Sequence, residues 1–469
     1  MAYKGTAKTL LDKVGIREGD SISIRAREGL VTGTLMPRPE SSDDEHLIIK
    51  LANGYNIGVE INGGEEIKKL DAFKKIGSFQ TKQAAFKEGK PKLTIIHTGG
   101  TIASRVDYRT GGVVSAFSPD ELLHLFPDLD KATNLNAVQA SNMFSEDVEP
   151  GHWKIWARQA VKEIGNGANG VIITHGTDTM HVSSAALSFM LQNLPVPILF
   201  VGAQRSSDRG SSDAEMNLMS AAHFAANADF AGVGLCMHAK TGEDYDYVHE
   251  GTKARKMHTS RRDAFRSVNA MPWARVWRDG RIEFLRDNRP RRDSARTPVL
   301  RDAMEEKVAL VKSFTGMPSE IISFYAERDY RGIVFEGTGL GHIPLNEHDE
   351  FTRRHPENLA RIREFCERGG VAVMTSSCLY GRINMNVYST GRDLLRAGVV
   401  PGADMTPETA LVKLKWVLGQ TRDAEQAKAM MLTNYAGEIS ERTEARAYID
   451  QFIDNNAEEF AKSLKPKKE

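Results

Sequence analysis

The sequence has few cysteines and no net charge. Only Cys236, Cys366 and Cys378 occur in 469 residues, and they show neither the close spacing nor the histidine neighbours of a metal site. We therefore expect reduced thiols in the core of a cytosolic protein, without disulfides or a bound metal. Lysine plus arginine and aspartate plus glutamate each number 62. This balance argues against attraction of the whole surface to nucleic acid or a membrane.

Long apolar runs and nucleotide-binding motifs are also missing. No apolar stretch approaches the ~18 residues of a membrane span. The opening residues MAYKGTAKTLLDKVG lack the apolar core of a secretory signal, so we expect a cytoplasmic protein that does not bind membranes. The chain contains neither GxGxxG after a strand nor GxxxxGK[ST]. We therefore expect no nucleotide or other cofactor on this chain.

Residues 1–70 differ in pattern from the rest. A short helix is expected from Thr6 to Val14, followed by alternating runs and a hairpin at Asn53-Gly54. Short strands at this spacing predict a small β-barrel of the SH3-like or OB-like kind. Such barrels more often serve as scaffold or docking modules. RNA contact is the alternative, although basic and aromatic residues are sparsely mixed here.

From Lys92 onward, strands alternate with helices. The runs KLTIIHT, GVIITHGT, PILFVGA and GVGLCMHA are apolar on both faces, which predicts an α/β fold with a parallel sheet covered on each side. A second, smaller α/β unit follows an arginine-rich stretch at 278–297, whose composition favours a solvated linker. The expected division is a barrel at 1–70, a linker at 71–91, a catalytic subdomain at 92–285, a linker at 286–305, a second subdomain at 306–445, and a C-terminal helix with a basic tail at 446–469.

Three polar motifs follow apolar strands or lie in glycine-rich loops. KLTIIHTGGTIAS (92–104) presents Thr101 after a glycine pair, which lets the backbone approach a ligand closely or adopt positive φ. VIITHGTDTM (171–180) presents Thr177 beside Asp178. A helix cap would explain either threonine alone. In parallel sheets, however, chemistry gathers at the carboxyl ends of strands, where both motifs fall.

The third motif, HEGTKARKMHTSRRDAFRS (249–267), supplies Lys253 in a loop flanked by glycine and threonine. A lysine that loses solvent among its neighbours can act as a base.

In this order, TGGTIAS, HGTDTM and GTKARK resemble the bacterial-type L-asparaginase/glutaminase family. DYRTG resembles the mobile lid of that family, and SEDVEP resembles its substrate-binding serine segment. The N-terminal barrel, KMHTSRRDAFRS, TSSCLYGRINMNVYSTGRDLL and PETALVKLKWVLG resemble one branch, the D subunit of the archaeal glutamyl-tRNA(Gln) amidotransferase. The resemblance implies an asparaginase-like, two-subdomain parallel-sheet enzyme preceded by the small barrel.

The resemblance also assigns catalytic roles. Thr101 is the attacking hydroxyl, and Tyr108 on the lid closes over it. Thr177, Lys253 and Asp178 form a second triad that moves protons. Which threonine attacks first stays open. Amide hydrolysis needs a nucleophile, a base and donors for the oxyanion, and this set supplies the first two.

Substrate contacts follow in the same way. Ser145 is expected to bind the α-carboxylate of the substrate and Asp178 its α-ammonium, while the backbone N–H groups of Thr177 and Ala203 serve the oxyanion. Glu146 stands where asparaginases commonly carry glutamine. A carboxylate there can pair with the substrate ammonium, and it leaves the choice between glutamine and asparagine open.

The implied reaction converts glutamine to glutamate and ammonia. In the resembled complex, the amidotransferase E subunit is the partner that binds Glu-tRNA(Gln), ATP and Mg, and it uses the ammonia to form Gln-tRNA(Gln). The resemblance also suggests a homodimer within a heterotetramer. Two alternatives are a free-standing L-asparaginase and a non-catalytic scaffold or RNA-binding protein. The intact set of Thr101, Thr177, Asp178 and Lys253 speaks against the second alternative.

Overall fold

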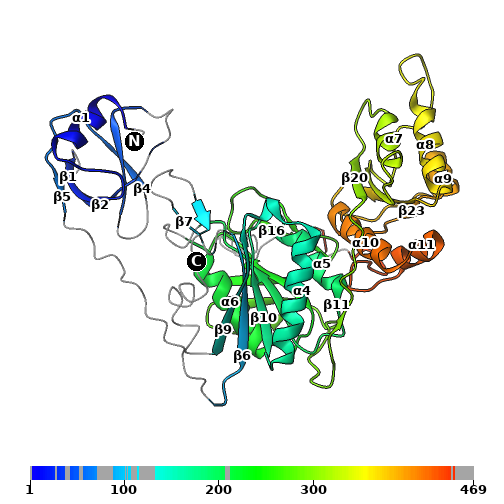
Figure 1. Cartoon of the computed structure of the whole chain (residues 1–469), viewed down its shortest axis with the longest axis horizontal. Coiled ribbons are helices and arrows are strands. Elements are labelled where there is room, and N and C mark those ends of the chain that lie inside the picture. The colour runs from blue at the N-terminus through cyan, green and yellow to red at the C-terminus, as the bar shows by residue number, and fades with distance from the viewer. Residues whose placement is uncertain are drawn as a thin grey trace, which may run out of the picture.

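The computed structural model describes most of the two α/β units and the N-terminal unit (Figure 1). Thr101, Tyr108 and the Asn53-Gly54 turn lie outside the described residues, which are 3–26, 29–36, 38, 43–51, 56–70, 88–100, 102, 104–106, 113–115, 133–205, 212–444 and 447–448.

The N-terminal unit is a small antiparallel sheet packed on one helix. Leu10 and Leu11 of the helix share a buried core with Ile22 and Ile24, which alternate inward along the first strand as a half-buried strand requires. The expected helix is confirmed, with its bounds shifted by one residue at each end. In the sheet order β4-β3-β2-β1-β5, the strands flanking the predicted hairpin turn pair antiparallel. The elements are α1 (Gly5–Lys13), β1 (Ser21–Ala26), β2 (Gly29–Leu35), β3 (His46–Lys50), β4 (Asn56–Glu60) and β5 (Ile67–Lys69).

The larger α/β unit is built on an eight-stranded sheet in the order β18-β17-β14-β13-β12-β10-β6-β9. Its elements are β6 (Lys92–Gly99), β7 (Ser104–Val106), β8 (Val113–Ser115), β9 (Asn134–Met143), the 3-10 helix η2 (Ser145–Asp147), α4 (Pro150–Gly165), β10 (Gly170–Thr174), α5 (Met180–Met190), β11 (Leu191–Gln192), β12 (Ile198–Val201), α6 (Ala214–Asn227), β13 (Val233–His238), β14 (Tyr245–Glu250), β15 (Ala254–Lys256), β16 (Phe265–Ser267), β17 (Ala274–Trp277), β18 (Ile282–Phe284) and β19 (Val299–Leu300).

This sheet is mixed, whereas a parallel sheet was expected. The four predicted strands β6, β10, β12 and β13 do run parallel. The next strands, β14, β17 and β18, are antiparallel. The physical reason is the short connection at 239–244, because a parallel return needs a crossover of about a dozen residues or more.

Helices cover both faces of the sheet, so its central strands are apolar throughout. In β10, Val171 and Ile173 pack in one core with α4 and α5, while Ile172 packs in another core with α6. Successive side chains of a strand point to opposite faces, which explains this division. The expectation of helices on each side is confirmed.

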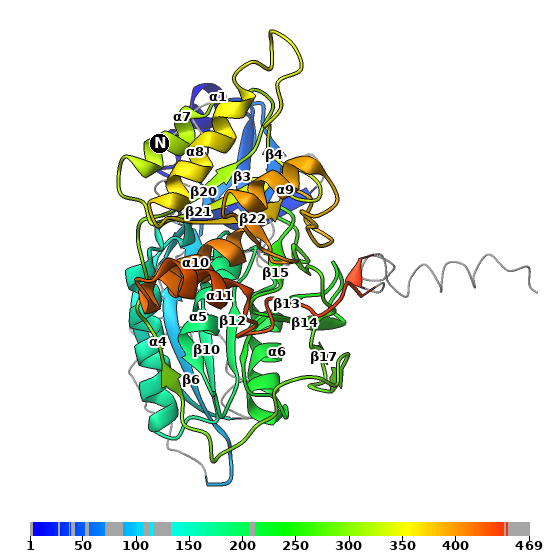
Figure 2. The ribbon, with the colours of Figure 1, turned by 90° about the vertical axis from the view of Figure 1, so that its right-hand side faces the viewer.

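The second α/β unit has four parallel strands in the order β20-β21-β22-β23. Figure 2 shows α10 of this unit beside α5 of the first. Phe189 of α5 stacks on Trp416 of α10 with ring centroids 5.8 Å apart, and one hydrophobic core joins the two units. The elements are β20 (Val308–Lys312), α7 (Glu320–Ala326), β21 (Gly332–Gly337), α8 (His355–Glu367), β22 (Val371–Ser376), α9 (Ser389–Arg396), β23 (Val400–Pro401), α10 (Pro407–Gln420) and α11 (Ala424–Leu432).

The arginine-rich stretch is not a freely solvated linker, which corrects that interpretation. Arg292 donates Nε to the carbonyl of Ala228 at 2.5 Å and Nη1 to the carbonyl of Asn169 at 2.7 Å, and it also binds the carbonyl of Ala225. The contacts with Ala225 and Ala228 satisfy carbonyls at the end of α6, and the contact with Asn169 reaches the segment before β10. The stretch therefore fastens itself to the larger unit.

The cysteines are only partly as expected. All three are free, and Cys236 is buried, but Cys366 is half-buried and Cys378 is exposed. The prediction of three core thiols is therefore wrong for Cys378, which follows β22 in a surface turn. Across the described residues, the helices are too short or too polar to cross a membrane.

Candidate active site

The carboxyl ends of β6, β9 and β10 meet at one edge of the sheet. A Cβ atom added to Gly99 would lie 2.3 Å from the carbonyl oxygen of Met143, and one added to Gly100 would lie 2.3 Å from the backbone nitrogen of Gly176. Both glycines also have positive φ, at 114° and 84°. Glycine is therefore needed at both positions for two reasons: the backbone has positive φ, and the neighbouring loops leave no room for a Cβ atom.

The loops after β9, β10 and β12 touch each other at the same edge. A Cβ on Gly176 would lie 2.8 Å from the Cβ of Ser145, which is buried. A Cβ on Gly202 would lie 3.0 Å from Cγ2 of Thr177. Thr179 donates its hydroxyl to the carbonyl of Ser145 at 2.5 Å instead of capping α5. The structure thus places Ser145 and the residue before Ala203 around Thr177.

A lysine completes this group, and it is Lys256. Its Nζ lies 2.8 Å from Oγ1 of Thr177 and 2.8 Å from Oδ1 of Asp178. The side chain of Lys256 is 10% exposed, whereas that of Asp178 is 68% exposed. The Thr177 hydroxyl, the Lys256 side-chain nitrogen and the Asp178 carboxylate therefore form a connected set with one open side, which suits proton transfer to a bound molecule.

The structure does not place Lys253 at this site, which corrects the predicted triad. Nζ of Lys253 lies 2.8 Å from Oδ2 of Asp404 in the second unit, and the two side chains are 1% and 2% exposed. Lys253 ends the turn that precedes β15, and successive side chains within β15 alternate in direction, so Arg255 and Lys256 point to opposite faces. Arg255 follows this rule and pairs with Glu408 of the second unit. Lys256 faces Thr177.

The sequence signal for this distinction was weak. Two lysines lie three positions apart in GTKARK, and the motif does not reveal which of them faces the sheet edge. The choice between the two lysines becomes clear only in the folded structure. There β15 pairs with β16, and the second unit covers the face of this hairpin that points away from the sheet edge.

His175, within the HGTDTM motif, supports the site without exchanging protons. Its Nδ1 lies 2.6 Å from the carbonyl of Gly176, and its Nε2 lies 2.9 Å from Oγ of Ser183. Burial lowers the pKa of His175 to about 4. A neutral imidazole with both nitrogens engaged holds the loop in place across the neutral pH range.

A polar network fixes the loop that contains Ala203. Asp213 accepts hydrogen bonds from the backbone N–H groups of Gln204 and Arg205, each at 3.0 Å. Asn217 donates to the carbonyl of Gly202 at 2.9 Å and to Asp213 at 3.1 Å. No sequence pattern predicts this network, because its members are separated in the chain and share no local motif.

His238 extends the network into the core. Its Nδ1 lies 2.5 Å from Oδ1 of Asn217 and 3.2 Å from Oδ1 of the buried Asp246. Burial alone would lower the pKa of His238, but the hydrogen bond and charge of Asp246, together with the charges of Asp213 and Glu243, raise it above the usual value. The imidazolium form is therefore favoured by folding.

We predict a pH-dependent stability from this histidine. A pKa raised by folding stabilises the protein fully below about 6.5, the unfolded value, and this contribution is lost as the pH rises through the raised pKa. Between pH of about 6.5 and the raised pKa, the melting temperature of the wild type should fall as the pH rises. The melting temperature of His238→Gln should fall less over the same pH interval. Thermal unfolding of both proteins across the interval measures the effect. Parallel curves for the two proteins would contradict the assignment.

The other predicted residues differ in their outcome. Glu146 is exposed next to the buried Ser145 in η2, and Ala203 is buried behind Thr177. Thr101 and Tyr108 lie outside the described residues, so their roles remain predictions. Among the residues that the structure describes, no group of three or more His, Cys, Asp or Glu side chains could hold a metal ion.

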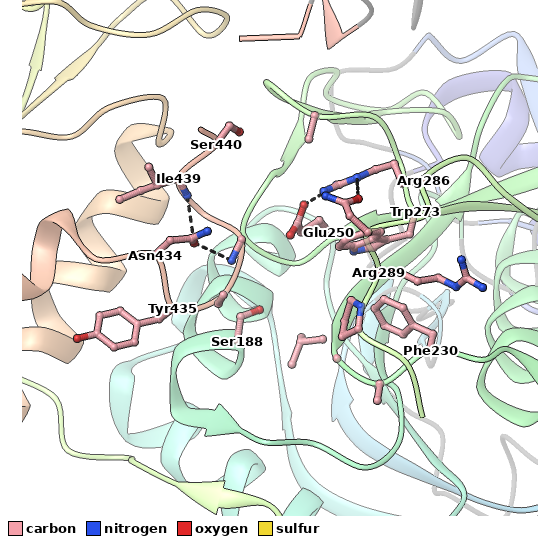
Figure 3. Close-up of a pocket in the computed structure, with 18 of the residues that line it drawn as sticks. Ser188, Phe230, Glu250, Trp273, Arg286, Arg289, Asn434, Tyr435, Ile439 and Ser440 are labelled. Carbon is pink, nitrogen blue, oxygen red and sulfur yellow. Dashed lines mark hydrogen bonds and ion pairs between the residues drawn. The ribbon is translucent and has the colours of Figure 1, made fainter. Parts of the chain in front are cut away.

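A cavity of about 900 Å³ lies elsewhere, between the two α/β units. Figure 3 shows Asn434, Tyr435 and Ser440 on one wall and Glu250 and Arg286 on the other. Neither Thr177 nor Lys256 lines it. The chemistry of the polar set, rather than the size of this cavity, identifies the candidate active site.

The fold is that of the asparaginase and glutaminase class. The family described as Asparaginase, N-terminal, matches residues 92–290, and the Glutaminase/Asparaginase C-terminal domain matches 307–431. The thermostable L-asparaginase from Thermococcus kodakarensis is 32% identical, with a TM-score of 0.65 over 75% of this chain and 100% of that chain. L-asparaginase I from Vibrio cholerae is 29% identical, with a TM-score of 0.64 over 75% of this chain and 99% of that chain.

The N-terminal unit narrows the identification. Residues 16–70 match the GatD N-terminal domain. The glutamyl-tRNA(Gln) amidotransferase D subunit from Pyrococcus horikoshii is 48% identical over 94% of this chain and 98% of that protein. The protein of the same name from Methanobrevibacter smithii is 44% identical over 96% of this chain and 100% of that protein. The chain belongs to the family of glutamyl-tRNA(Gln) amidotransferase D subunits.

Proposed function

We propose that this chain is the glutaminase subunit of a tRNA-dependent amidotransferase. It hydrolyses glutamine to glutamate and ammonia, and the ammonia serves the conversion of Glu-tRNA(Gln) to Gln-tRNA(Gln). The observation that carries the proposal is the contact of Lys256 with both Thr177 and Asp178 at 2.8 Å. Membership of the D-subunit family supplies the biological reaction.

In the proposed mechanism, the hydroxyl oxygen of Thr101 attacks the amide carbon of glutamine. Thr177 accepts the hydroxyl proton while passing its own to Lys256, and the proton then returns to the departing nitrogen. The carbon–nitrogen bond breaks, its electron pair stays on nitrogen, and ammonia leaves an ester on Thr101. Water attacks the ester by the same proton route and releases glutamate. Tyr108 is proposed to close over Thr101 during these steps.

Asp178 has two roles in this proposal. Its carboxylate stabilises the ammonium form of Lys256 after proton uptake, because opposite charges at hydrogen-bond distance favour each other. Its exposed carboxylate is also proposed to bind the α-ammonium of glutamine, with Glu146 as a second carboxylate. Ser145 is proposed to bind the α-carboxylate. The backbone N–H groups of Thr177 and Ala203 are proposed to stabilise the oxyanion.

A partner must complete the reaction. Ammonia in water near neutral pH is mostly ammonium, which cannot attack an acyl group, so transfer needs a sheltered route. We propose that the amidotransferase E subunit holds ATP, Mg and Glu-tRNA(Gln), and that two copies of each chain assemble as a heterotetramer around a homodimer of this protein in the cytoplasm.

The test of this function compares the purified chain alone with the chain plus its partner. Glutamine turnover should be weak alone and should rise when partner, Glu-tRNA(Gln) and ATP are added. Fast asparagine hydrolysis by the lone chain, unchanged by the partner, would instead support the free-standing L-asparaginase. No amide hydrolysis under any condition would support the scaffold or RNA-binding alternative.

A further inference from the structure

We propose that Lys253 and Asp404 form a clamp between the two α/β units that positions Lys256 for catalysis. The proposal rests on the glutaminase function and deepens it. Lys253 is then a positioning residue, which acts through the hairpin that carries Lys256, and is not itself the base. Through this clamp, the rate of amide hydrolysis depends on the position of the second unit relative to the first.

Asp404 is the centre of several contacts. Its Oδ2 binds Nζ of Lys253 at 2.8 Å, and its Oδ1 accepts the backbone N–H of Ser440 at 3.0 Å. Its carbonyl accepts Nδ2 of Asn269 at 2.9 Å. Arg382 lies 3.8 Å from Oδ1 and also binds the carbonyl of Ser440. One buried carboxylate therefore joins the larger unit to two segments of the second unit.

Neighbouring residues fasten the same hairpin to the second unit. Thr252 donates to the carbonyl of Ala436 at 3.0 Å, and its own carbonyl accepts the hydroxyl of Thr409 at 2.9 Å. Arg255 binds Glu408 through two nitrogens, at 2.9 and 3.3 Å. Because directions alternate along β15, one face of the hairpin is held by the second unit while Lys256 on the other face reaches Thr177.

The interface between the two α/β units is not tightly packed along its whole length. The cavity of about 900 Å³ separates the segment 434–440 from the wall formed by Glu250 and Arg286 (Figure 3). Gly437 is an exception, because a Cβ there would lie 1.8 Å from Oε1 of Glu250. Beside this cavity, polar contacts hold the segment in place: Asp404 binds Ser440, Thr252 binds Ala436 and Lys413 pairs with Glu438.

The ionised form of Asp404 is favoured although its side chain is buried. Burial would raise the pKa of Asp404, but the charge and hydrogen bond of Lys253 and the hydrogen bonds of Ser440 hold it below the usual value. Removing one partner leaves an uncompensated buried charge, whereas removing both relieves it. Comparing the single with the double variant therefore distinguishes a loss of stability, which the double variant should restore, from a loss of positioning, which it should not.

The experiment compares Lys253→Met, the double variant Lys253→Met/Asp404→Asn, and Lys312→Met as a control at a surface ion pair. Lys312 forms an ion pair of the same length, 2.8 Å, with Glu336 far along the chain from the site residues. Steady-state kinetics with glutamine, the pH profile of kcat and thermal unfolding are measured on the full chain with its partner.

Lys253→Met should lower kcat about 10- to 100-fold with KM within about twofold, because a displacement of the base by about 1 Å costs that much while the substrate contacts remain. The acidic limb of the kcat profile should move. The double variant should recover the melting temperature but not kcat. The control should match the wild type.

Three results would overturn the proposal: an unchanged kcat per folded molecule in Lys253→Met, recovery of kcat together with stability in the double variant, or a loss as complete as that of Lys256→Met. Asparagine is assayed beside glutamine. If the glutaminase function is wrong, wild-type activity appears on asparagine instead, and the positioning claim is still measured as the ratio of variant to wild type.

Discussion

Lys256→Met should abolish glutamine-dependent amidation of Glu-tRNA(Gln), while amidation from free ammonium should continue. Methionine matches the lysine side chain as far as Cε but lacks the nitrogen that lies 2.8 Å from both Thr177 and Asp178. Loss of a positioned acid–base group costs about 10²- to 10⁴-fold. The measurement is formation of Gln-tRNA(Gln) with each nitrogen source. Thr101→Val should behave in the same way.

The control for this variant is Lys240→Met. Lys240 pairs with the exposed Asp244 at 3.0 Å, so its replacement removes a lysine of the same unit without touching the proposed site. Both nitrogen sources should remain active in the control. If Lys256→Met loses both activities equally, Lys256 serves assembly or folding, and the proposed proton route is wrong.

Gly100→Ala should also lower glutamine hydrolysis by about 100-fold or more. The new Cβ would lie 2.3 Å from the backbone nitrogen of Gly176, and backbone at that position cannot yield as a flexible side chain can. The positive φ of 84° adds strain of about 1–2 kcal/mol for any residue with a Cβ. The turn before Thr101 must then move away from the loop that carries Thr177. Kinetics and thermal unfolding measure the two effects.

Gly165→Ala is the matched control for this substitution. Gly165 ends α4, and a Cβ there meets nothing within 4 Å. Alanine in a helix is more favourable than glycine, so stability should stay equal or rise slightly while kcat is unchanged. Similar losses in both variants would show that the close approach of Gly100 to Gly176 has no special importance.

The sequence predicts the sheet edge well because its signals are local. The strands β6, β10 and β12 are short apolar runs, and each ends in the glycine or hydroxyl residues that form the site. Parallel strands bring such ends together, so the strand pattern groups Thr177 and Asp178 at this edge, whereas Ser145 was predicted only from the family resemblance. The antiparallel strands after β13 were missed because their direction depends on the length of the connection at 239–244.

The lysine and the supporting networks could not be predicted in the same way. Choosing Lys256 over Lys253 requires the position of the second unit, since Asp404 lies about 150 residues further along the chain and captures Lys253. The contacts of His238 and Asn217 behind Ala203 likewise join distant segments. Tertiary packing decides such pairings, and a motif of a few residues carries no information about it.

Transfer of labelled nitrogen is the most direct test of the glutaminase assignment. The complex is given glutamine labelled with ¹⁵N in the side-chain amide, ATP, Glu-tRNA(Gln) and excess unlabelled ammonium. Gln-tRNA(Gln) should carry the label with the wild-type chain and should lose it with Lys256→Met, which then uses only the unlabelled ammonium. Labelled product of equal yield from both proteins, or none from the wild type, would contradict the role of this site as the source of the ammonia.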